Sequence, residues 1–409
     1  ATALQQEEHL PEAIVCKWCG KSFHYLKSHI SMGRCENIPE SAKGLDVDEV
    51  VKMYTSAFPD EPTISRTALA KLNEKRAEKH SGEGKVAEIS AHPGYAGTVE
   101  YKTELVAAHE LLGVTIKELG TPRGKPLQVT VNVNTPYPEF VPEAKKNYVY
   151  GDFDLIKDIF MMLEIGIPGY LWGHAGTGKS SLPTQLCALL NRPLIRAQHT
   201  ASMEEAHVTG QILARDGSTY FEPGLLALAM KNGWVYLADE YDFAFPQILG
   251  VYQPVLEGEP LIIKEATPDW RRITPHKRFA FIGTGNTNGS GDETGLYQGT
   301  NIQNAANFSR FGIVSNVKYM STKAEVNMLA EAGVIREYAE KMVKFANLVR
   351  EGYEQHLISQ PIGPRELLLS AKIGMMRGDF SAGIEKSFIN KLPSTSAQAA
   401  REVVQKIFG

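Results

Sequence analysis

The chain has 409 residues, of which 43% are hydrophobic and 22% are charged, and its formal net charge is −4. These globular values exclude a disordered or fibrous protein, and at roughly 150 residues per domain they suggest two or three domains. The net charge gives no field that would hold the whole molecule to nucleic acid, so any such affinity has to be local. No apolar run approaches the roughly 20 residues of a membrane span. Residues 1–13 lack the basic and apolar regions of a signal peptide, so we expect a cytoplasmic protein.

Cysteine is unevenly distributed, because three of the four cysteines lie within residues 14–36. Such crowding is typical of a metal site in a reducing compartment. Two of the cysteines form a C-x2-C pair, and a histidine and the third cysteine follow at distances suited to tetrahedral Zn²⁺. The predicted zinc ligands are Cys16, Cys19, His29 and Cys35, with His24 as an alternate ligand. The opposing interpretation is that these are unpaired cysteines in a flexible tail. The run CGKSFHYLKSH resembles small zinc fingers, in which the metal supplies the folding energy that so short a module lacks.

The same segment is locally basic, since no acid lies between Glu12 and Glu36. Its basic residues are Lys17, Lys21, Lys27 and Arg34. Such a face could bind the phosphates of a nucleic acid or an acidic protein, and it is too small to decide between them.

The N-terminal part of the chain is expected to be modular. Residues 1–80 hold the zinc finger and short helices. Residues 81–138 form a linker and an N-terminal extension, which starts at the flexible run SGEG. Within this extension, residues 127–133 alternate apolar and polar side chains, as a half-buried strand does.

The rest of the chain predicts one α/β domain and one helical domain. Residues 139–320 alternate helical and strand-like runs, which is typical of a parallel sheet flanked by helices. After Met320 the strands stop, and residues 321–409 are predicted to form a small all-helical domain. Thr322 and Glu325 have the spacing of a capping box at its first helix.

The run GHAGTGKS fits the phosphate-loop pattern G-x-x-x-x-G-K-[ST] and stands between a strand-like run, GYLW, and a helical run. In such a loop, backbone N–H groups turn toward the phosphates, a lysine reaches the β- and γ-phosphate oxygens, and a hydroxyl ligates Mg²⁺. Lys179 and Ser180 take the last two roles, whereas His174 is interpreted as a spacer. The predicted nucleotide-binding residues are Gly173, His174, Ala175, Gly176, Thr177, Gly178, Lys179, Ser180 and Ser181, together with Asp239.

Carboxylates needed for ATP hydrolysis follow in the run WVYLADE, which reads as a buried strand ending in Asp239 and Glu240. In α/β proteins this end of a strand is where ligands bind. Asp239 is predicted to hold Mg²⁺ together with Ser180, and Glu240 to act as the general base on the attacking water. An exposed strand end decorated with acids is the alternative. A further strand-like run, RFAFIG, leads to Asn286, which could orient the water or belong to an ordinary turn.

This ordered set of motifs resembles the AAA+ superfamily and, within it, the MoxR branch with its CobS-like ATPases. The resemblance covers residues 139–375 and rests on GHAGTGKSS, VTGQILARDGSTYFEPGLLALAMKNGWVYLADEYDFA, GTGNTNGSGDETGLYQGT and NFSRFGIV. It implies that Asn286 is the sensor-1 residue, Arg310 the arginine finger and Arg365 the sensor-2 arginine. It also implies a P-loop α/β domain, a helical lid and a hexameric ring with each ATP between neighbouring subunits. An arginine finger stabilises charge on the γ-phosphoryl group and can come from another subunit.

Two inserted hairpins are also predicted. The dipeptide Asp216-Gly217 stands between strand-like flanks, as in a hairpin turn. The resemblance places this hairpin at the pore of the ring, which makes Tyr220 and Phe221 candidate contacts for a substrate or partner; packing on the domain core is the alternative. Residues 256–263 are predicted to form the second hairpin.

The sequence therefore predicts an ATPase that uses ATP, Mg²⁺ and Zn²⁺ and couples ATP hydrolysis to the remodelling of a partner protein or complex. One alternative is the ATPase subunit of a cobalt chelatase, which works with a partner bearing a von Willebrand A-type domain. A second alternative is a nucleic-acid motor that uses the zinc finger as a reader.

Overall fold

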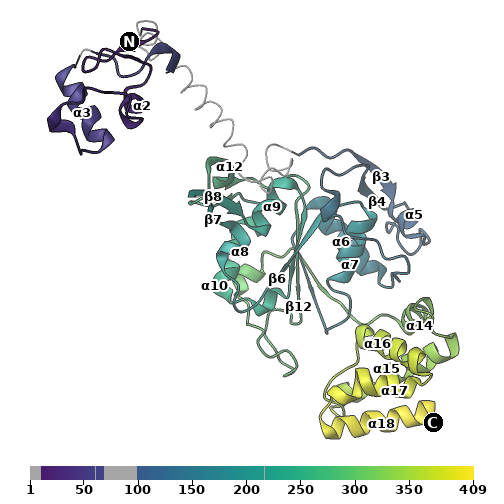
Figure 1. The fold of residues 1–409 in the computed structure, drawn as a ribbon. Helices are drawn as coiled ribbons and strands as arrows, with labels where there is room; N and C mark the ends of the chain where they lie inside the picture. Colours follow the sequence, from purple (N-terminus) through teal and green to yellow (C-terminus); the bar gives the residue numbers. More distant parts are fainter. Residues whose placement is uncertain (1–10, 60, 69–98, 216) are drawn as a thin grey trace. The chain divides into compact units, whose positions relative to one another are not determined.

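The computed structural model describes residues 11–59, 61–68, 99–215 and 217–409. The chain splits into two compact units, Ala1–Pro93 and Gly94–Gly409 (Figure 1). The predicted linker run SGEG, at residues 81–84, lies outside the described residues.

The N-terminal unit is a small fold of short elements. It contains the antiparallel strands β1 (Ile14–Val15) and β2 (Ser22–Phe23), the helix α2 (Leu26–Ser31), the 3₁₀ helix η1 (Glu40–Ala42) and the helix α3 (Val47–Ala57). Helix α3 begins at a capping box, because the Asp46 carboxylate accepts hydrogen bonds from the N–H groups of Asp48 and Glu49 at 2.8 and 2.9 Å. Beneath these elements lies a core of nine buried residues, two of which are Cys16 and Cys35.

The second unit is built on a five-stranded sheet in the order β13-β5-β12-β9-β6, and each neighbouring pair is parallel. The strands are β5 (Gly169–Trp172), β6 (Leu194–Gln198), β9 (Val235–Asp239), β12 (Ala280–Gly285) and β13 (Ile313–Asn316). The predicted α/β fold with a parallel sheet is confirmed. All residues of β9 and β12 are buried, as expected for central strands of a parallel sheet covered on both faces.

Helices cover both faces of this sheet (Figure 1). Helices α6 (Phe153–Ile165) and α7 (Ser181–Leu189) pack on one face, which includes Val235 and Leu237 of β9. Helix α9 (Leu225–Asn232) packs on the other, which includes the alternate residues Tyr236 and Ala238.

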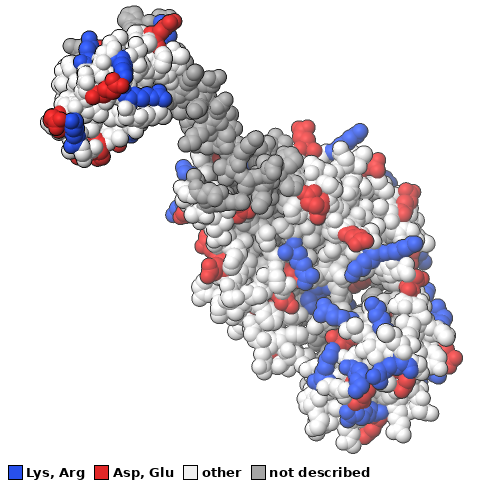
Figure 2. Space-filling view, in the orientation of Figure 1, with Lys and Arg blue, Asp and Glu red and all other residues white. Residues whose placement is uncertain are grey.

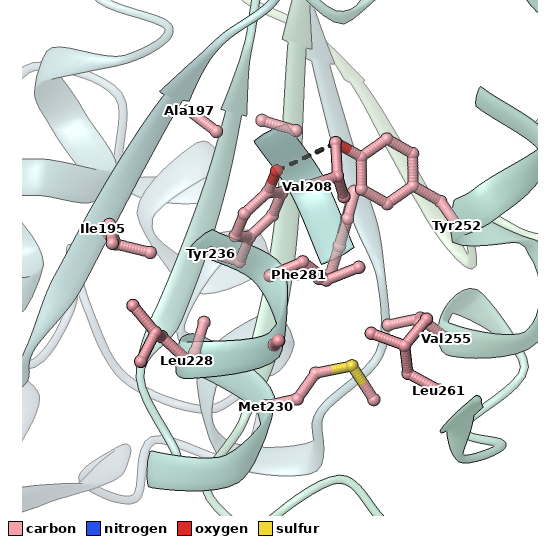
Figure 3. Close-up of a cluster of buried hydrophobic side chains, with 14 of the residues drawn as sticks. Ile195, Ala197, Val208, Leu228, Met230, Tyr236, Tyr252, Val255, Leu261 and Phe281 are labelled. Atoms are coloured by element: carbon pink, nitrogen blue, oxygen red, sulfur yellow. Dashed lines mark hydrogen bonds between the residues drawn. The ribbon is translucent and has the colours of Figure 1, made fainter. Parts of the chain in front are cut away.

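The core on the second face holds an internal hydrogen bond between two tyrosines. Tyr236 and Tyr252 join their hydroxyls at 2.8 Å among Met230, Val255 and Phe281 (Figure 3). Because each phenol is fully buried, the bond satisfies a polar group that would otherwise be costly to bury.

Shorter elements connect and extend the sheet. They are β3 (Thr103–Ala107), α5 (Ala108–Leu112), β4 (Gln128–Asn132), η3 (Pro138–Phe140), α8 (Glu205–Thr209), β7 (Gly210–Arg215), β8 (Ser218–Pro223), η4 (Tyr241–Phe243), α10 (Pro246–Leu249), η5 (Gly250–Tyr252), α11 (Gln253–Leu256), β10 (Leu261–Ile262), α12 (Pro268–Arg271), β11 (Arg272–Ile273) and α13 (Ala305–Phe308). The strand expected at residues 127–133 is confirmed as β4, which pairs with β3. The first predicted hairpin is confirmed as β7 and β8.

The second predicted hairpin, at residues 256–263, is wrong. Residues up to Leu256 belong to helix α11, and β10 pairs instead with β11, ten residues further along the chain. Pro254 lies in the first turn of α11, a position that favours a helix, so the turn-like run EGEP ends a helix and does not join two strands.

The C-terminal part of the unit is all helical, as predicted. Its helices are α14 (Thr322–Glu331), α15 (Arg336–Glu354), α16 (Pro364–Arg377), α17 (Phe380–Ser387) and α18 (Ser394–Phe408), with the 3₁₀ helix η6 (Ile389–Lys391) between the last two. They share one hydrophobic core. We call this group of helices the lid.

The predicted capping box of the lid is wrong by one residue. Ser321, not Thr322, caps α14, since its hydroxyl accepts a hydrogen bond from the Ala324 N–H at 3.3 Å. Glu325 does not reach back to the cap. It is fully buried and pairs with Arg350, because a buried carboxylate needs a charged or hydrogen-bonding partner.

Among the residues that the structure describes, no helix has both the length and the apolar character needed to cross a membrane.

Candidate nucleotide-binding site

The phosphate loop joins β5 to α7, as its motif predicts. The backbone of Gly173 has φ = 148°, and a Cβ at this position would lie only 2.4 Å from the Val317 carbonyl oxygen. Gly178 has φ = 102°. Only glycine adopts such conformations without strain, so the two glycines allow the loop to turn tightly at the end of the strand.

Lys179 lies inside this loop and contacts the end of a second strand. Its ammonium donates to the carbonyl oxygens of Gly173 and His174 at 2.7 and 2.8 Å, and to the side-chain oxygen of Asn286 at 3.1 Å. Burial lowers the pKa of Lys179 to about 8. The sequence predicted Lys179 and Asn286 separately, and the structure brings them into contact.

Asp239 ends β9 and accepts hydrogen bonds from two hydroxyls. The Ser180 and Thr284 side chains donate to the same carboxylate oxygen, each at 2.5 Å. The Arg196 guanidinium donates to the other oxygen, through Nε at 2.6 Å and through a second nitrogen. Burial alone would raise the pKa of Asp239, but these hydrogen bonds and the Arg196 charge lower it.

The pair of Ser180 and Asp239 fits a magnesium site. A hydroxyl and an ionised carboxylate are hard oxygen ligands of the kind that Mg²⁺ prefers, and here they already touch beside the phosphate loop.

Glu240 follows Asp239 in a left-handed backbone conformation, with φ = 52°. This conformation is uncommon for a residue other than glycine, and such residues cluster at functional sites. Its carboxylate accepts a hydrogen bond from the Gln198 side-chain amide, and its N–H donates to the Thr284 hydroxyl at 3.3 Å. Burial raises the pKa of Glu240, and the nearby charges of Asp239 and Asp242 raise it further. A raised pKa makes a carboxylate a better proton acceptor.

Asp242 is a part of the site that the sequence reasoning missed. Its carboxylate accepts hydrogen bonds from the N–H groups of Asn286 and Thr287 at 2.8 and 2.9 Å, and from the Thr287 hydroxyl at 3.0 Å. The side chain is fully buried, and burial raises its pKa. Asp242 lies in the 3₁₀ helix η4, directly after Glu240 and the end of β9, and from there it fixes the backbone of Asn286. The sequence signal that could have indicated Asp242 is its position two residues after the predicted base Glu240.

Tyr297 was missed as well. Its hydroxyl accepts the Ala175 N–H at 3.1 Å and lies 2.9 Å from Nδ1 of His174. Burial lowers the pKa of His174, and the positive charge of Lys179 lowers it further. His174, interpreted from the sequence as a spacer, is therefore packed and hydrogen-bonded within the site.

Of the two predicted arginines, one lies beside the loop. Arg365 is in the first turn of α16, and a Cβ built on Gly176 would lie 3.5 Å from the Cβ of Arg365. Arg310 instead pairs with Glu257 at 2.6 Å and donates to the Ala306 carbonyl at 2.5 Å. Among the described residues, no hydrogen bond or ion pair joins Arg310 to the phosphate loop.

The two aromatics of the first hairpin differ in their surroundings. Phe221 packs against the second-face core, with its ring 6.4 Å from that of Trp270. Tyr220 is half-buried. The structure thus supports the core-packing alternative for Phe221.

The N-terminal unit brings the four predicted zinc ligands together, with one ligand atom from each within 4.8 Å of all the others. Two sulfurs at ~2.3 Å from a tetrahedral Zn²⁺ lie about 3.8 Å apart. The Cys16 and Cys35 sulfurs are 3.8 Å apart, and the Cys19 sulfur is 3.3 Å from Nε2 of His29. The alternate, His24, contacts the Ser65 hydroxyl at 3.1 Å and lies outside the cluster. The donor set therefore fits zinc.

The basic residues around this cluster are largely paired. The ion pairs are Lys17 with Glu61, Lys21 with Glu36, and Lys27 with Asp48. Figure 2 shows basic and acidic side chains side by side on this unit. Acids that are distant in the sequence thus offset the local positive charge, which weakens the case for a nucleic-acid reader.

Comparison with known proteins places the site in a family. The AAA domain family of the dynein-related subfamily matches residues 170–300. Aerobic cobaltochelatase subunit CobS of Sinorhizobium sp is 32% identical over 249 residues, 58% of this chain and 74% of that protein. An uncharacterized protein of Staphylococcus aureus is 23% identical over 265 residues, 63% of this chain and 96% of that protein.

Among solved structures, the RuvB Holliday junction branch migration motor of Thermotoga maritima has a TM-score of 0.38 and 13% identity, covering 65% of this chain and 72% of RuvB. The parallel sheet, the phosphate loop and the domain match define a P-loop protein with an AAA domain. The chain belongs to the AAA+ ATPase family that includes CobS.

Lys179 allows a prediction about proton uptake. Its pKa of about 8 should rise when phosphates bind beside it, because negative charge favours the ammonium. ATP binding should therefore take up close to one proton per chain at about pH 9 and much less at about pH 7. The measurement is the dependence of the calorimetric binding enthalpy on the ionisation enthalpy of the buffer.

Lys179→Arg is the matched control, since a guanidinium keeps its proton throughout this range. The assignment fails if the wild type shows the same uptake at both pH values, or if the control retains the pH dependence.

Proposed function

We propose that this chain hydrolyses ATP and couples the hydrolysis to the remodelling of a partner protein or complex. The observation that carries the proposal is the meeting of Lys179, Asp239, Glu240 and Asn286 at one edge of the parallel sheet. Residues 139–320 would form the ATPase domain and residues 321–409 its lid. The cytoplasmic location remains a prediction.

The geometry supports a division of labour. Lys179 would hold the β- and γ-phosphates, and Ser180 with Asp239 would hold Mg²⁺, which neutralises charge that develops on the phosphate oxygens. Glu240 would accept a proton from the attacking water, which its raised pKa favours. Asn286, fixed by Asp242, would orient that water against the γ-phosphate.

The two arginines would act from different sides. Arg365, beside the loop, would contact the γ-phosphate of its own subunit. Arg310, paired with Glu257 away from the loop, would act on ATP bound by a neighbouring subunit. This arrangement requires an assembly in which each site is shared, and we propose a hexameric ring.

The zinc module would serve as an adaptor for a partner. The four ligands fit Zn²⁺, and three lysines around them pair with acids, which favours a protein over a nucleic acid as the partner.

A second candidate function is the ATPase subunit of a cobalt chelatase. The 32% identity to CobS supports it. A partner with a von Willebrand A-type domain and a large chelatase subunit would then be expected, and copurification from the native host would reveal them.

Glu240→Gln and Lys179→Ala should separate hydrolysis from binding. Removing the proposed base should lower kcat by at least about a hundredfold while nucleotide binding persists. Lys179→Ala should instead lose nucleotide affinity, because the phosphates lose their cation. Turnover and nucleotide binding are measured side by side. Glu205→Gln, an exposed acid of α8, is the control and should behave as wild type. Near-normal turnover of Glu240→Gln would remove this residue from the base role.

Mixing variants should test whether Arg310 acts in trans. Arg310→Ala and Glu240→Gln subunits should each be nearly inactive alone. In an equimolar mixture about a quarter of the interfaces would join an intact Glu240 to an intact Arg310, so part of the activity should return. Full ATPase activity in a strictly monomeric protein, or an unchanged rate for Arg310→Ala, would refute the shared site.

Metal analysis should test the zinc site. Wild type should contain about one zinc per chain, and Cys16→Ser should lose it, because three remaining ligands hold the ion weakly. His24→Ala is the matched control and should keep its zinc, since His24 lies outside the cluster. Basal ATP turnover should survive in both variants. Zinc-free wild type, or a loss of turnover together with zinc, would contradict the adaptor assignment.

A further inference from the structure

A stack of rings connects the phosphate loop to the lid. The imidazole of His174 stacks parallel to the ring of Tyr319, with centroids 5.9 Å apart and planes 1° from parallel. Tyr319 also contacts the Arg350 guanidinium, whose central carbon lies 4.0 Å from the ring centroid. Tyr353, one turn after Arg350 on α15, meets the His174 ring edge to face at 5.7 Å. The lid thus contacts the phosphate loop through the side chain of His174.

Arg350 ties three segments of the lid together. Two of its nitrogens donate to the fully buried carboxylate of Glu325 on α14, at 2.7 and 2.8 Å. Its Nε donates to the carbonyl oxygen of Ile362 at 3.0 Å. A bidentate pair fixes both the position and the plane of the guanidinium, so its Nε–H points in a defined direction. That direction is toward the segment that precedes α16.

The segment at Ile362, which Arg350 holds, brings the start of α16 into close contact with the phosphate loop. A Cβ at Gly363, directly after Ile362, would lie 2.8 Å from the Ala175 carbonyl oxygen. Two residues later stands Arg365, whose Cβ is 3.5 Å from the position that a Cβ of Gly176 would take. The location of Arg365 therefore depends on how closely the segment at Gly363 approaches the loop.

We propose that Arg350 is a positioning residue for Arg365 and that its stack through Tyr319 on His174 couples the lid to the phosphate loop. When the loop closes on a triphosphate, His174 moves with it, and the stack carries Arg350 and the start of α16 along. Arg365 then reaches the γ-phosphate, which ATP has and ADP lacks. This inference rests on the proposed contact of Arg365 with the γ-phosphate.

An ordinary packing role predicts a different outcome. A core residue that only holds the lid together would, when altered, weaken ATP and ADP binding equally or destabilise the fold. A positioning residue for Arg365 would affect the nucleotide with a γ-phosphate selectively. The ratio of the two affinities therefore separates the two roles.

The test compares Tyr319→Leu with Tyr319→Phe in the full chain. Leucine removes both the stack on His174 and the face under Arg350, so the preference for a slowly hydrolysed ATP analogue over ADP should fall about tenfold. Phenylalanine keeps the ring, and among the described residues the Tyr319 hydroxyl makes no hydrogen bond, so this variant should keep the wild-type preference. Dissociation constants for both nucleotides are measured by calorimetry, and thermal unfolding shows that each variant is folded.

Arg365→Ala distinguishes failure of this inference from failure of the proposed function. If Arg365→Ala lowers the preference while Tyr319→Leu leaves it unchanged or weakens both nucleotides equally, the coupling is refuted and the role of Arg365 stands. If Arg365→Ala itself leaves the preference unchanged, the proposed γ-phosphate contact is wrong. Arg350→Lys gives a second measurement, because lysine keeps the charge but loses the bidentate pair and should also lower the preference.

Discussion

A parallel sheet places the carboxyl ends of its strands along one edge, and this constraint determines where the chemistry of the protein lies. The phosphate loop follows β5, Asp239 ends β9, and Asn286 follows β12. Because β5 and β9 are the two neighbours of β12, these three ends are adjacent although more than a hundred residues separate the first from the last. The same geometry buries the central strands β9 and β12 on both faces, so the polar groups of the site gather near the carboxyl ends of the strands.

Burying charged side chains at this edge costs free energy of solvation. Hydrogen bonds and opposite charges within the site offset part of that cost. Burial opposes the charged forms of both Lys179 and Asp239, but the outcomes differ. Lys179, with carbonyl and amide partners, keeps a lowered pKa, whereas Asp239, with two hydroxyls and the Arg196 guanidinium, has its pKa lowered despite burial. The site is thus ready for a ligand that brings negative charge to Lys179, and an anionic phosphate is such a ligand.

The sequence predicted those parts of the fold and site that depend on local pattern. The phosphate loop, the strand before Asp239 and the all-helical C-terminal part follow from spacing and periodicity within a few residues. Asp242, Tyr297 and Arg350 could not be found in this way, because each acts on a partner more than 20 residues away that only the folded chain brings close. The two wrong predictions, the capping box at Thr322 and the hairpin at residues 256–263, also arise from contacts between distant parts of the chain.

Two examples show how tertiary contacts overrule local signals. Glu325 has the spacing of a capping residue, but the bidentate partner offered by Arg350 is stronger than a capping contact at a helix end. Residues 256–263 carry the composition of a turn, but the partner strand of β10 lies beyond α12. Spacing alone cannot rank such competing contacts.

Under the proposed shared site, the ion pair with Glu257 would hold Arg310 within its own subunit until a neighbour binds ATP. Acting in trans requires Arg310 to leave Glu257, whose side chain is 50% exposed. Exposed ion pairs contribute only about 0–1 kcal/mol, and release also breaks the hydrogen bond from Arg310 to the Ala306 carbonyl oxygen. The charge-assisted bonds that a γ-phosphate offers would offset both losses. The pair would keep Arg310 beside the exposed Glu257 between encounters, while a neighbouring subunit with bound ATP would outcompete Glu257. A buried, fully paired carboxylate in place of Glu257 would hold Arg310 more strongly and would oppose assembly. The exposure of Glu257 therefore favours a shared site.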